Sequence, residues 1–234
     1  MKVRSAYILV SHGSRDRRPQ LAMAKLGQLL SDKLGVEVGT ATLELGPLPL
    51  HAQICELANR AIAVGCKQLQ VLPLFLLPGV HVMEDIPAAV ALAQQALGNR
   101  MAIEIRPYLG SHGGLEQLLA TQQQELLADA WILLSHGSRR VGGNQHVLEM
   151  ASKLSAMAAY WSLRPSLESS IAELAAAGAA SIGILPYFLF AGGITEAIAW
   201  RVRQLLFEFP TVQLQLGKPI EASVELADLI LELT

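Results

Sequence analysis

Two stretches of the chain, AYILVSHGSRDRRPQ beginning at Ala6 and AWILLSHGSRRVGGN beginning at Ala130, are nearly the same sequence. In each, a short apolar run ends in Ser-His-Gly-Ser-Arg, which is typical of a buried strand followed by a loop that carries polar side chains. The histidines of the two stretches, His12 and His136, lie 136 − 12 = 124 residues apart. We therefore interpret the chain as two copies of one unit.

Two further pairs of segments support the duplication. Glu44 in TATLELG and Glu168 in RPSLESS have the same offset, 168 − 44 = 124. VLPLFLLPGVHVMEDIP, beginning at Val71, matches ILPYFLFAGGITEAIAW, beginning at Ile184, at an offset of 184 − 71 = 113. The second copy is therefore expected to have lost helix and loop residues between its glutamate and its Leu-Pro segment.

Short β-branched or aliphatic runs alternate with longer amphipathic stretches in both halves, a pattern typical of a parallel sheet covered by helices. We predict an α/β fold with two similar lobes, residues 1–115 and 116–234, each a mainly parallel sheet flanked by helices. The two lobes are expected to face each other across a cleft. Gly35, Gly65 and Gly98 fall just past predicted helices, where glycine commonly ends a helix. The predicted strands are 6–10, 36–43, 68–75, 101–106, 130–135, 157–163, 181–189 and 212–216, and the predicted helices are 20–34, 47–64, 82–97, 114–128, 142–155, 167–178, 194–208 and 220–232.

Composition limits the possible classes of protein. The 234 residues are 52% hydrophobic and 16% charged, which favours a folded globular chain. The formal net charge of -2 argues against an extensive nucleic-acid surface, and no apolar run reaches the length of about 20 residues that a membrane helix needs. We expect a cytoplasmic protein without nucleic-acid or membrane partners, as a monomer or homodimer.

The two cysteines give no sign of a metal site. Cys55 and Cys66 form no CxxC pair, and both are expected to be small buried apolar residues.

Polar residues follow the first three predicted strands. His12 comes just after the first strand, Glu44 ends the second, and His81 lies a few residues beyond the third. Because ligands of open parallel sheets bind at the carboxyl ends of the strands, these side chains should border one crevice. Two imidazoles and a carboxylate suit a divalent first-row metal such as iron, cobalt, nickel or zinc, and three protein ligands leave positions open. The sequence thus predicts a site that hands a metal to another molecule.

Each of these residues also has an ordinary structural interpretation. His12 lies beside Gly and Ser and is able to satisfy backbone groups in a turn. Glu44 is equally compatible with a helix cap or a solvated carboxylate, and His81 with the first turn of a helix. Their joint placement at successive strand ends favours the functional interpretation.

The second copy is an internal comparison. His136 and Glu168 are retained, but Ile194 or Thr195 stands where the first copy has His81, and neither side chain replaces an imidazole. The C-terminal half is therefore expected not to bind the metal.

The segments VSHGSR, TATLELGPLP and LPLFLLPGVHVMEDIP resemble the sirohydrochlorin chelatases of the class II chelatase family. The resemblance covers about the first 115 residues closely and the remainder as a weaker second copy. It implies that His12 and His81 bind the incoming metal with Glu44 beside them, and that the tetrapyrrole sirohydrochlorin lies between two facing lobes. It further implies a lyase with no organic cofactor, for which divalent iron, cobalt or nickel is a substrate. The sequence shows no Walker A or GxGxxG loop.

Metal insertion requires two pyrrole N–H protons to leave, and a neutral imidazole or a carboxylate is a suitable base. We assign His12 as the base, with His81 and Glu44 holding the metal. Glu84, one helical turn after His81, is a candidate to assist, against its interpretation as a first-turn carboxylate favoured by the helix dipole. The sequence leaves open whether the metal is iron, in a siroheme pathway, or cobalt, in a cobalamin pathway.

Sirohydrochlorin carries many carboxylates, so basic side chains are expected around the site. Three arginines, Arg15, Arg17 and Arg18, follow His12 at once, although a solvated loop also explains them. Of the other histidines, His112 is expected in a loop entering a helix, and His51 and His146 are expected to be structural or solvated.

Two other functions are compatible with parts of the sequence. A His-based phosphatase places arginine directly before its His-Gly pair, whereas Ser11 stands there in this chain. A metal or tetrapyrrole carrier would use the same ligands but release its cargo stoichiometrically. Turnover therefore distinguishes a carrier from a chelatase.

Overall fold

The computed structural model describes residues 4–234 and contains two four-stranded sheets whose paired strands all run parallel. Their strand orders, β2-β1-β3-β4 and β6-β5-β7-β8, are the same order repeated. The predicted two-lobe α/β fold is confirmed, and the strand ends differ from prediction by no more than three residues. The strands are β1 (Ser5–Ser11), β2 (Val38–Thr42), β3 (Gln68–Pro73), β4 (Ala102–Ile105), β5 (Ala130–Ser135), β6 (Met157–Tyr160), β7 (Ser181–Tyr187) and β8 (Gln213–Leu216).

The chain divides into two compact units. The N-terminal unit comprises the chain through His112 together with Ala222–Thr234, and the C-terminal unit comprises Gly113–Glu221. The helices of the N-terminal unit are α1 (Arg17–Leu34), α2 (Leu50–Ala63), η1 (His81–Asp85), α3 (Ile86–Leu97), η2 (Gly98–Arg100), η3 (Leu109–Ser111) and α8 (Val224–Glu232). Those of the C-terminal unit are α4 (Leu115–Glu125), α5 (Gln145–Lys153), α6 (Leu167–Ala176) and α7 (Gly193–Glu208).

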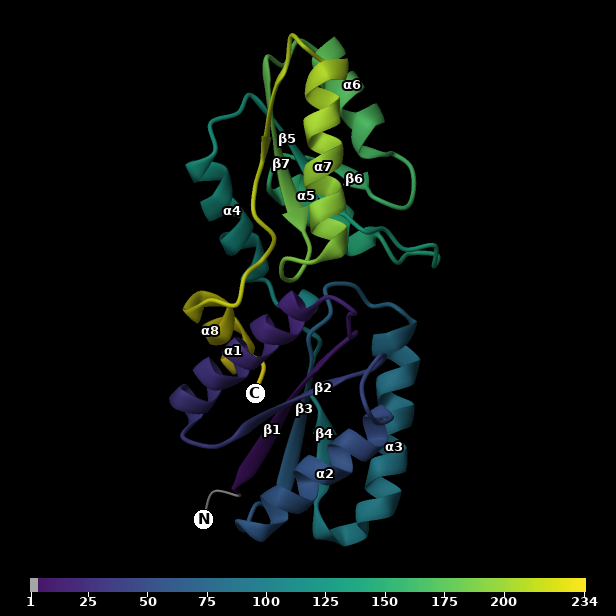
Figure 1. The fold of residues 1–234 in the computed structure, drawn as a ribbon, viewed down its shortest axis with the longest axis vertical. Coiled ribbons are helices and arrows are strands. Elements are labelled where there is room, and N and C mark those ends of the chain that lie inside the picture. Colours follow the sequence, from purple (N-terminus) through teal and green to yellow (C-terminus); the bar gives the residue numbers. More distant parts are fainter. Residues whose placement is uncertain (1–3) are drawn as a thin grey trace. The chain divides into compact units, whose positions relative to one another are not determined.

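Helices cover both faces of the sheet in the N-terminal unit (Figure 1). Ile8 and Val10 of β1 belong to the core formed with α2 and α3, while Leu9, between them, is fully buried on the opposite side of the strand. Burial on both faces explains why this strand is a continuous apolar run rather than an alternating one. Each such side chain contributes about 1.5–3 kcal/mol on burial.

The boundaries of α1 follow from its capping residues. Asp16 accepts a hydrogen bond of 2.9 Å from the backbone N–H of Arg18, and Gly35 ends the helix in the left-handed conformation, with φ 67°. Gly65, just after α2, and Gly98, the C-cap residue of α3, also have positive φ. Both lie at helix ends, as the sequence predicts. The buried face of α1 consists of Met23, Leu26, Gly27 and Leu30.

The C-terminal helix α8 belongs to the N-terminal unit. The Lys33 ammonium lies 2.7 Å from the Asp228 carboxylate, which joins α1 to α8. The Arg106 guanidinium donates a hydrogen bond of 2.7 Å to the carbonyl of Leu233. Residues Ala222–Thr234 therefore belong to the same unit as β1 and α1.

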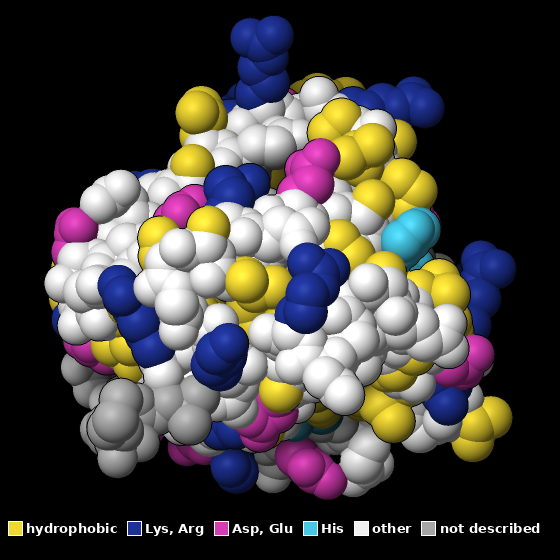
Figure 2. Space-filling view, turned by 90° about the horizontal axis from the view of Figure 1, so that it is seen from below, with side chains coloured by type: hydrophobic (Ala, Val, Ile, Leu, Met, Phe, Trp, Pro, Cys, Tyr) yellow, Lys and Arg dark blue, Asp and Glu magenta, His cyan; other side chains and the backbone are white. Residues whose placement is uncertain are grey.

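Charged side chains are mixed by sign on the surface drawn in Figure 2, where lysines and arginines lie among acidic and apolar side chains. This matches the nearly balanced charge of the sequence. Within residues 4–234, the helices are all too short or too polar to cross a membrane.

Strand register shows how the two copies correspond. Ile8 pairs with Val71 in the first sheet, and Ile132 pairs with Ile184 in the second. The offsets of 132 − 8 = 124 and 184 − 71 = 113 are those predicted from the sequence. In the neighbouring strand pair, however, Gly39 lies opposite Ile8 and Met157 lies opposite Ile132, so β2 and β6 are related by 157 − 39 = 118.

This register corrects the predicted pairing of Glu44 with Glu168. The backbone N–H of Glu44 donates to the carbonyl of His12 at 2.8 Å, and the N–H of Ser162 donates to the carbonyl of His136 at 3.0 Å. Ser162, at 162 − 44 = 118, is therefore the counterpart of Glu44. Glu168 lies in the first turn of α6 instead. The Leu-Glu match was misleading because some of the residues that the second copy lacks are missing before β6, where the offset is already 118 rather than 124.

Candidate metal centre

Three potential metal ligands converge beyond the carboxyl ends of β1, β2 and β3. One ligand atom from each of His12, Glu44 and His81 lies within 4.8 Å of the other two. The structure thus brings together the three residues that the sequence singled out: His12 and Glu44 from the loops after β1 and β2, and His81 from the start of η1. That they hold a metal ion remains a prediction.

The loops that carry His12 and Glu44 are joined through their backbones. Besides the bond from the Glu44 N–H to His12, the N–H of Leu43 donates to the carbonyl of Ser11 at 2.9 Å. Gly13 has φ 102°, and a Cβ at this position would lie 2.0 Å from the carbonyl oxygen of Glu44. Only glycine permits this approach of the two turns, which fixes the separation of the first two ligands.

The loop that leads from β3 to His81 is held on both sides. Leu74 donates its N–H to the carbonyl of Val10 at 2.7 Å, and Gly110 donates to the carbonyl of Phe75 at 2.8 Å. A Cβ on Gly110 would lie 2.0 Å from the carbonyl oxygen of Leu76. The segment around η3 therefore supports the loop from the side opposite β1.

The His81 imidazole has three neighbours. Its ring packs edge-on against that of His12, with centroids 4.7 Å apart and planes at 86°. Phe75 lies at a centroid distance of 6.0 Å. The Nδ1 atom is 2.7 Å from Oδ2 of Asp85, a contact that sequence reasoning missed although the i,i+4 spacing in HVMED was visible.

The site is accessible and bordered by apolar side chains. His12 and Glu44 are exposed, and the His81 side chain retains 31% of its accessibility. Leu45, on the Glu44 loop, is 61% exposed, and Met83, on η1, is 54% exposed. An ion or a flat apolar molecule is therefore able to approach the ligands from solvent.

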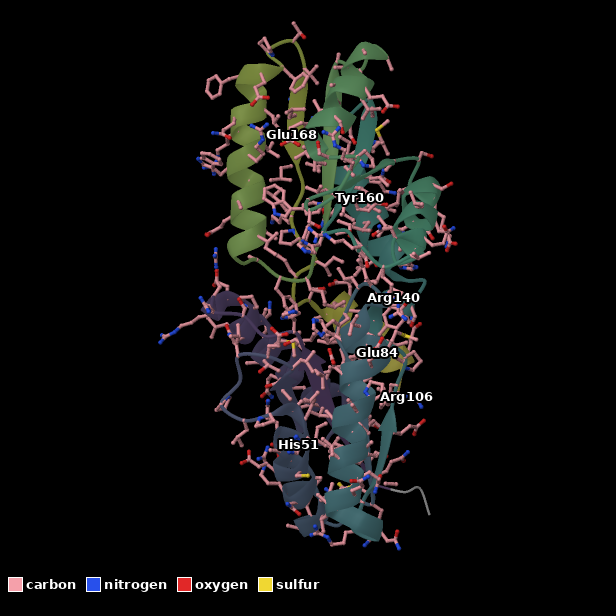
Figure 3. The ribbon with its side chains drawn as sticks, turned by 90° about the vertical axis from the view of Figure 1, so that its right-hand side faces the viewer. His51, Glu84, Arg106, Arg140, Tyr160 and Glu168 are labelled. Carbon is pink, nitrogen blue, oxygen red and sulfur yellow. The ribbon has the colours of Figure 1, made fainter. Side chains whose placement is uncertain are left out.

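The charged residues predicted near the site differ in their exposure and in their ion pairs. Arg18 pairs through its guanidinium with Asp16, and hydrogen bonds from the Arg18 side chain and backbone lower the pKa of Asp16 to about 2. Arg15 and Arg17 are exposed. Glu84 is exposed on η1, where Figure 3 labels it.

A profile of the CbiX family matches residues 6–126 and 130–234, which is nearly all of the sequence. The chain belongs to the CbiX family.

Relatives of this CbiX-family chain include two curated proteins. It is 25% identical over 175 residues to the sirohydrochlorin cobaltochelatase of Priestia megaterium, covering 68% of this chain and 57% of that protein. It is 30% identical over 122 residues to the chloroplastic sirohydrochlorin ferrochelatase of Arabidopsis thaliana, covering 52% of each. The chain thus spans little more than half the length of either relative.

Solved structures share the fold of this CbiX-family chain. SirB from Bacillus subtilis with Fe3+ superposes with a TM-score of 0.83 at 20% identity, covering 99% of this chain and 94% of that one. The sirohydrochlorin chelatase SirB from Bacillus subtilis subspecies spizizenii in complex with cobalt gives a TM-score of 0.77 at the same identity and coverage. At 20% sequence identity, these superpositions establish a shared fold.

In the second copy, the residues that correspond to His12, Glu44 and His81 of this CbiX-family chain do not form a similar cluster within the part of the chain that the structure describes. His136 is exposed, but its neighbour by register is Ser162, and Ile194 stands at the His81 position. Glu168 (Figure 3) is bound instead by the Arg201 guanidinium at 2.6 Å. Burial acts to raise the pKa of Glu168, but hydrogen bonds from Arg201, its own backbone N–H and Ser166 outweigh it and lower the pKa.

The remaining histidines lie in structural surroundings. His112 Nε2 is 3.1 Å from Oε2 of Glu232 on α8. His146 Nε2 is 3.3 Å from the hydroxyl of the buried Tyr187, and burial lowers the pKa of His146. His51 is half-buried on α2. Of the two cysteines, Cys66 is buried as predicted, whereas Cys55 is only half-buried and desolvation raises its pKa.

Proposed function

We propose that this chain is a sirohydrochlorin chelatase, a lyase that inserts Fe2+ or Co2+ into the tetrapyrrole. The observation that carries the proposal is the convergence of His12, Glu44 and His81 within 4.8 Å on an exposed edge of the N-terminal unit. The names of the curated relatives supply the substrate, because both act on sirohydrochlorin according to those names.

The ligand set fits an ion in transit. Imidazole and carboxylate together suit divalent first-row metals, and three protein ligands leave coordination positions for the pyrrole nitrogens of an incoming ring. An ion held by a closed set of four protein ligands would have to lose one before transfer. The exposed site instead favours ligand exchange with a second substrate.

The apolar border of the site suits one face of a macrocycle. Leu45 directly follows Glu44, Met83 lies on η1 with His81, and Val80, just before His81, is 50% exposed. A tetrapyrrole ring seated on these side chains would bury apolar surface on both partners. Its peripheral carboxylates would then reach the exposed arginines, of which Arg15 and Arg17 are candidates.

In this mechanism, Glu44 and His81 hold the metal while the ring nitrogens replace them one by one. Two N–H protons leave the ring as the metal enters: the His12 imidazole, once it has released the metal, accepts one of them, and the other passes to the solvent to which the site is open. No electron is transferred, and the charge of the entering ion is balanced by the two departing protons. The chain then needs no organic cofactor.

The test is an anaerobic metallation assay in which sirohydrochlorin absorbance is followed with Fe2+, Co2+ or Ni2+. Wild-type protein should metallate many equivalents of tetrapyrrole, whereas a carrier would stop at one. His81→Ala should abolish turnover while leaving the thermal unfolding midpoint nearly unchanged, because the ring is partly exposed. Near-normal turnover by His81→Ala would contradict the assignment. The rates with iron and cobalt would decide between a siroheme and a cobalamin role.

A further inference from the structure

We propose that Asp85 is a positioning residue that fixes the tautomer and direction of the His81 imidazole for metal binding. The proposal rests on the proposed function in one respect, that His81 is a metal ligand. Its basis is the 2.7 Å contact between His81 Nδ1 and Asp85 Oδ2.

The chemistry of the pair determines which nitrogen faces the metal. An ionised carboxylate only accepts hydrogen bonds, so Nδ1 of His81 must be the donor. In a neutral imidazole the other nitrogen then carries the lone pair. Nε2 is thereby the atom offered to the metal, as in metal sites where a carboxylate holds the other ring nitrogen of a histidine ligand.

The pair contributes orientation more than stability. The side chains of His81 and Asp85 retain 31% and 44% of their accessibility, and such solvent-exposed pairs stabilise a fold little. Orientation matters more, because without the carboxylate the ring is able to rotate or to adopt the other tautomer. Either change would move the donor nitrogen away from His12 and Glu44.

The His81–Asp85 pair lies within an unusual turn of the backbone. η1 is a π-helical turn in which the N–H of Ile86 donates to the carbonyl of His81, five residues earlier. Pro87 follows, and its ring would clash with the carbonyl four residues before it in a regular α-helix. A widened turn relieves this clash, and π turns are frequent at functional sites.

The second copy has lost both members together. At the offset of 113 that relates β3 to β7, His81 corresponds to Ile194 and Asp85 to Ile198, since 194 − 81 and 198 − 85 are both 113. Ile198 is 1% exposed in the core of the C-terminal unit, and α7 is a regular α-helix there. The carboxylate is thus present where the imidazole is present and replaced by a core residue where it is not.

The experiment compares wild type, Asp85→Ala, Asp85→Asn and the control Glu232→Gln. The control alters another histidine–carboxylate contact of the same unit, that of His112, which lies outside the proposed metal cluster. Histidine tautomers are read by long-range proton–nitrogen NMR of the metal-free protein at about pH 8, where a free imidazole is neutral. Co2+ affinity is measured by titration of its visible absorption, and thermal unfolding checks the fold.

We expect wild-type His81 to carry its proton on Nδ1 and Asp85→Ala to shift it towards Nε2. Co2+ binding should weaken about 10- to 100-fold in Asp85→Ala, with Asp85→Asn intermediate because its amide oxygen still accepts a hydrogen bond. Glu232→Gln should match wild type in both measurements.

An Asp85→Ala protein that keeps the wild-type tautomer, or binds Co2+ within about twofold of wild type, would overturn the proposal. Failure of the proposed function has a different signature. In that case the wild-type protein would bind Co2+ and show the Asp85 dependence, yet would not metallate sirohydrochlorin.

Discussion

Gly13→Ala is a stringent test of how the site is assembled, because the added methyl group meets backbone rather than side chain. A Cβ at Gly13 would lie 2.0 Å from the carbonyl oxygen of Glu44 and 2.9 Å from its carbonyl carbon. Neither atom is able to rotate away, so one of the two turns must move. The positive φ of 102° adds conformational strain for an L-residue.

The expected cost follows from these two effects. Left-handed strain is worth about 1–2 kcal/mol, and forcing an extra carbon into a packed region about 1–3 kcal/mol. Together they predict a loss of about 2–5 kcal/mol and a fall in the unfolding midpoint on the order of 10 °C. Because the displaced turn carries Glu44, Co2+ binding should weaken as well.

Gly35→Ala is the matched control. Gly35 also has positive φ, at 67°, but a Cβ there meets nothing within 4 Å. This variant should therefore lose only the strain of about 1–2 kcal/mol and should bind Co2+ like wild type. Thermal unfolding and Co2+ titration are measured for both. Equal unfolding midpoints in the two variants, with Co2+ binding retained in Gly13→Ala, would refute the close approach of the turns as the basis of the site.

Three further predictions concern other parts of the molecule. Gly110→Ala should lower both the unfolding midpoint and Co2+ affinity, because its Cβ would lie 2.0 Å from the Leu76 carbonyl oxygen; normal Co2+ binding would disprove support of the His81 loop by this segment. Burial lowers the pKa of His146 in the folded protein below its ordinary value of 6.5. The unfolded chain therefore takes up a proton first as the pH falls, so the free energy of unfolding should decrease once the pH falls below about 6.5. His146→Gln should reduce this loss, measured as the decrease of the unfolding midpoint with falling pH. A variant whose midpoint falls with pH as steeply as that of wild type would contradict the prediction. His136→Ala should metallate sirohydrochlorin almost normally, and a large loss of turnover would implicate the second copy.

Much of the fold was predictable from local pattern. The eight predicted strands are all present, and the ends of the α-helices lie within four residues of prediction. Apolar runs indicate the strands and helices, and glycines indicate where helices end, as Gly35 does for α1. The convergence of the three ligands was also predictable, because parallel strands direct their carboxyl ends to one edge of the sheet.

Other features depend on information that local pattern lacks. The match between Glu44 and Glu168 was a coincidence of two letters, and only strand register identifies Ser162 as the counterpart of Glu44. The packing of α8 with the N-terminal unit was not visible, since an amphipathic helix does not specify which core it covers. The contact of His81 with Asp85 joins residues four apart and was open to prediction from HVMED, whereas the π turn that contains both residues was not predicted.

Whether His12, Glu44 and His81 share one ion can be decided by anomalous diffraction from crystals grown with Co2+. We expect a single strong peak in the N-terminal unit, at about 2.0–2.2 Å from a nitrogen of each imidazole and from a carboxylate oxygen of Glu44, the distances usual for zinc with these ligands. For His81 that nitrogen should be Nε2. A peak bound to only one of the two imidazoles, or located at other residues, would contradict the proposed metal centre.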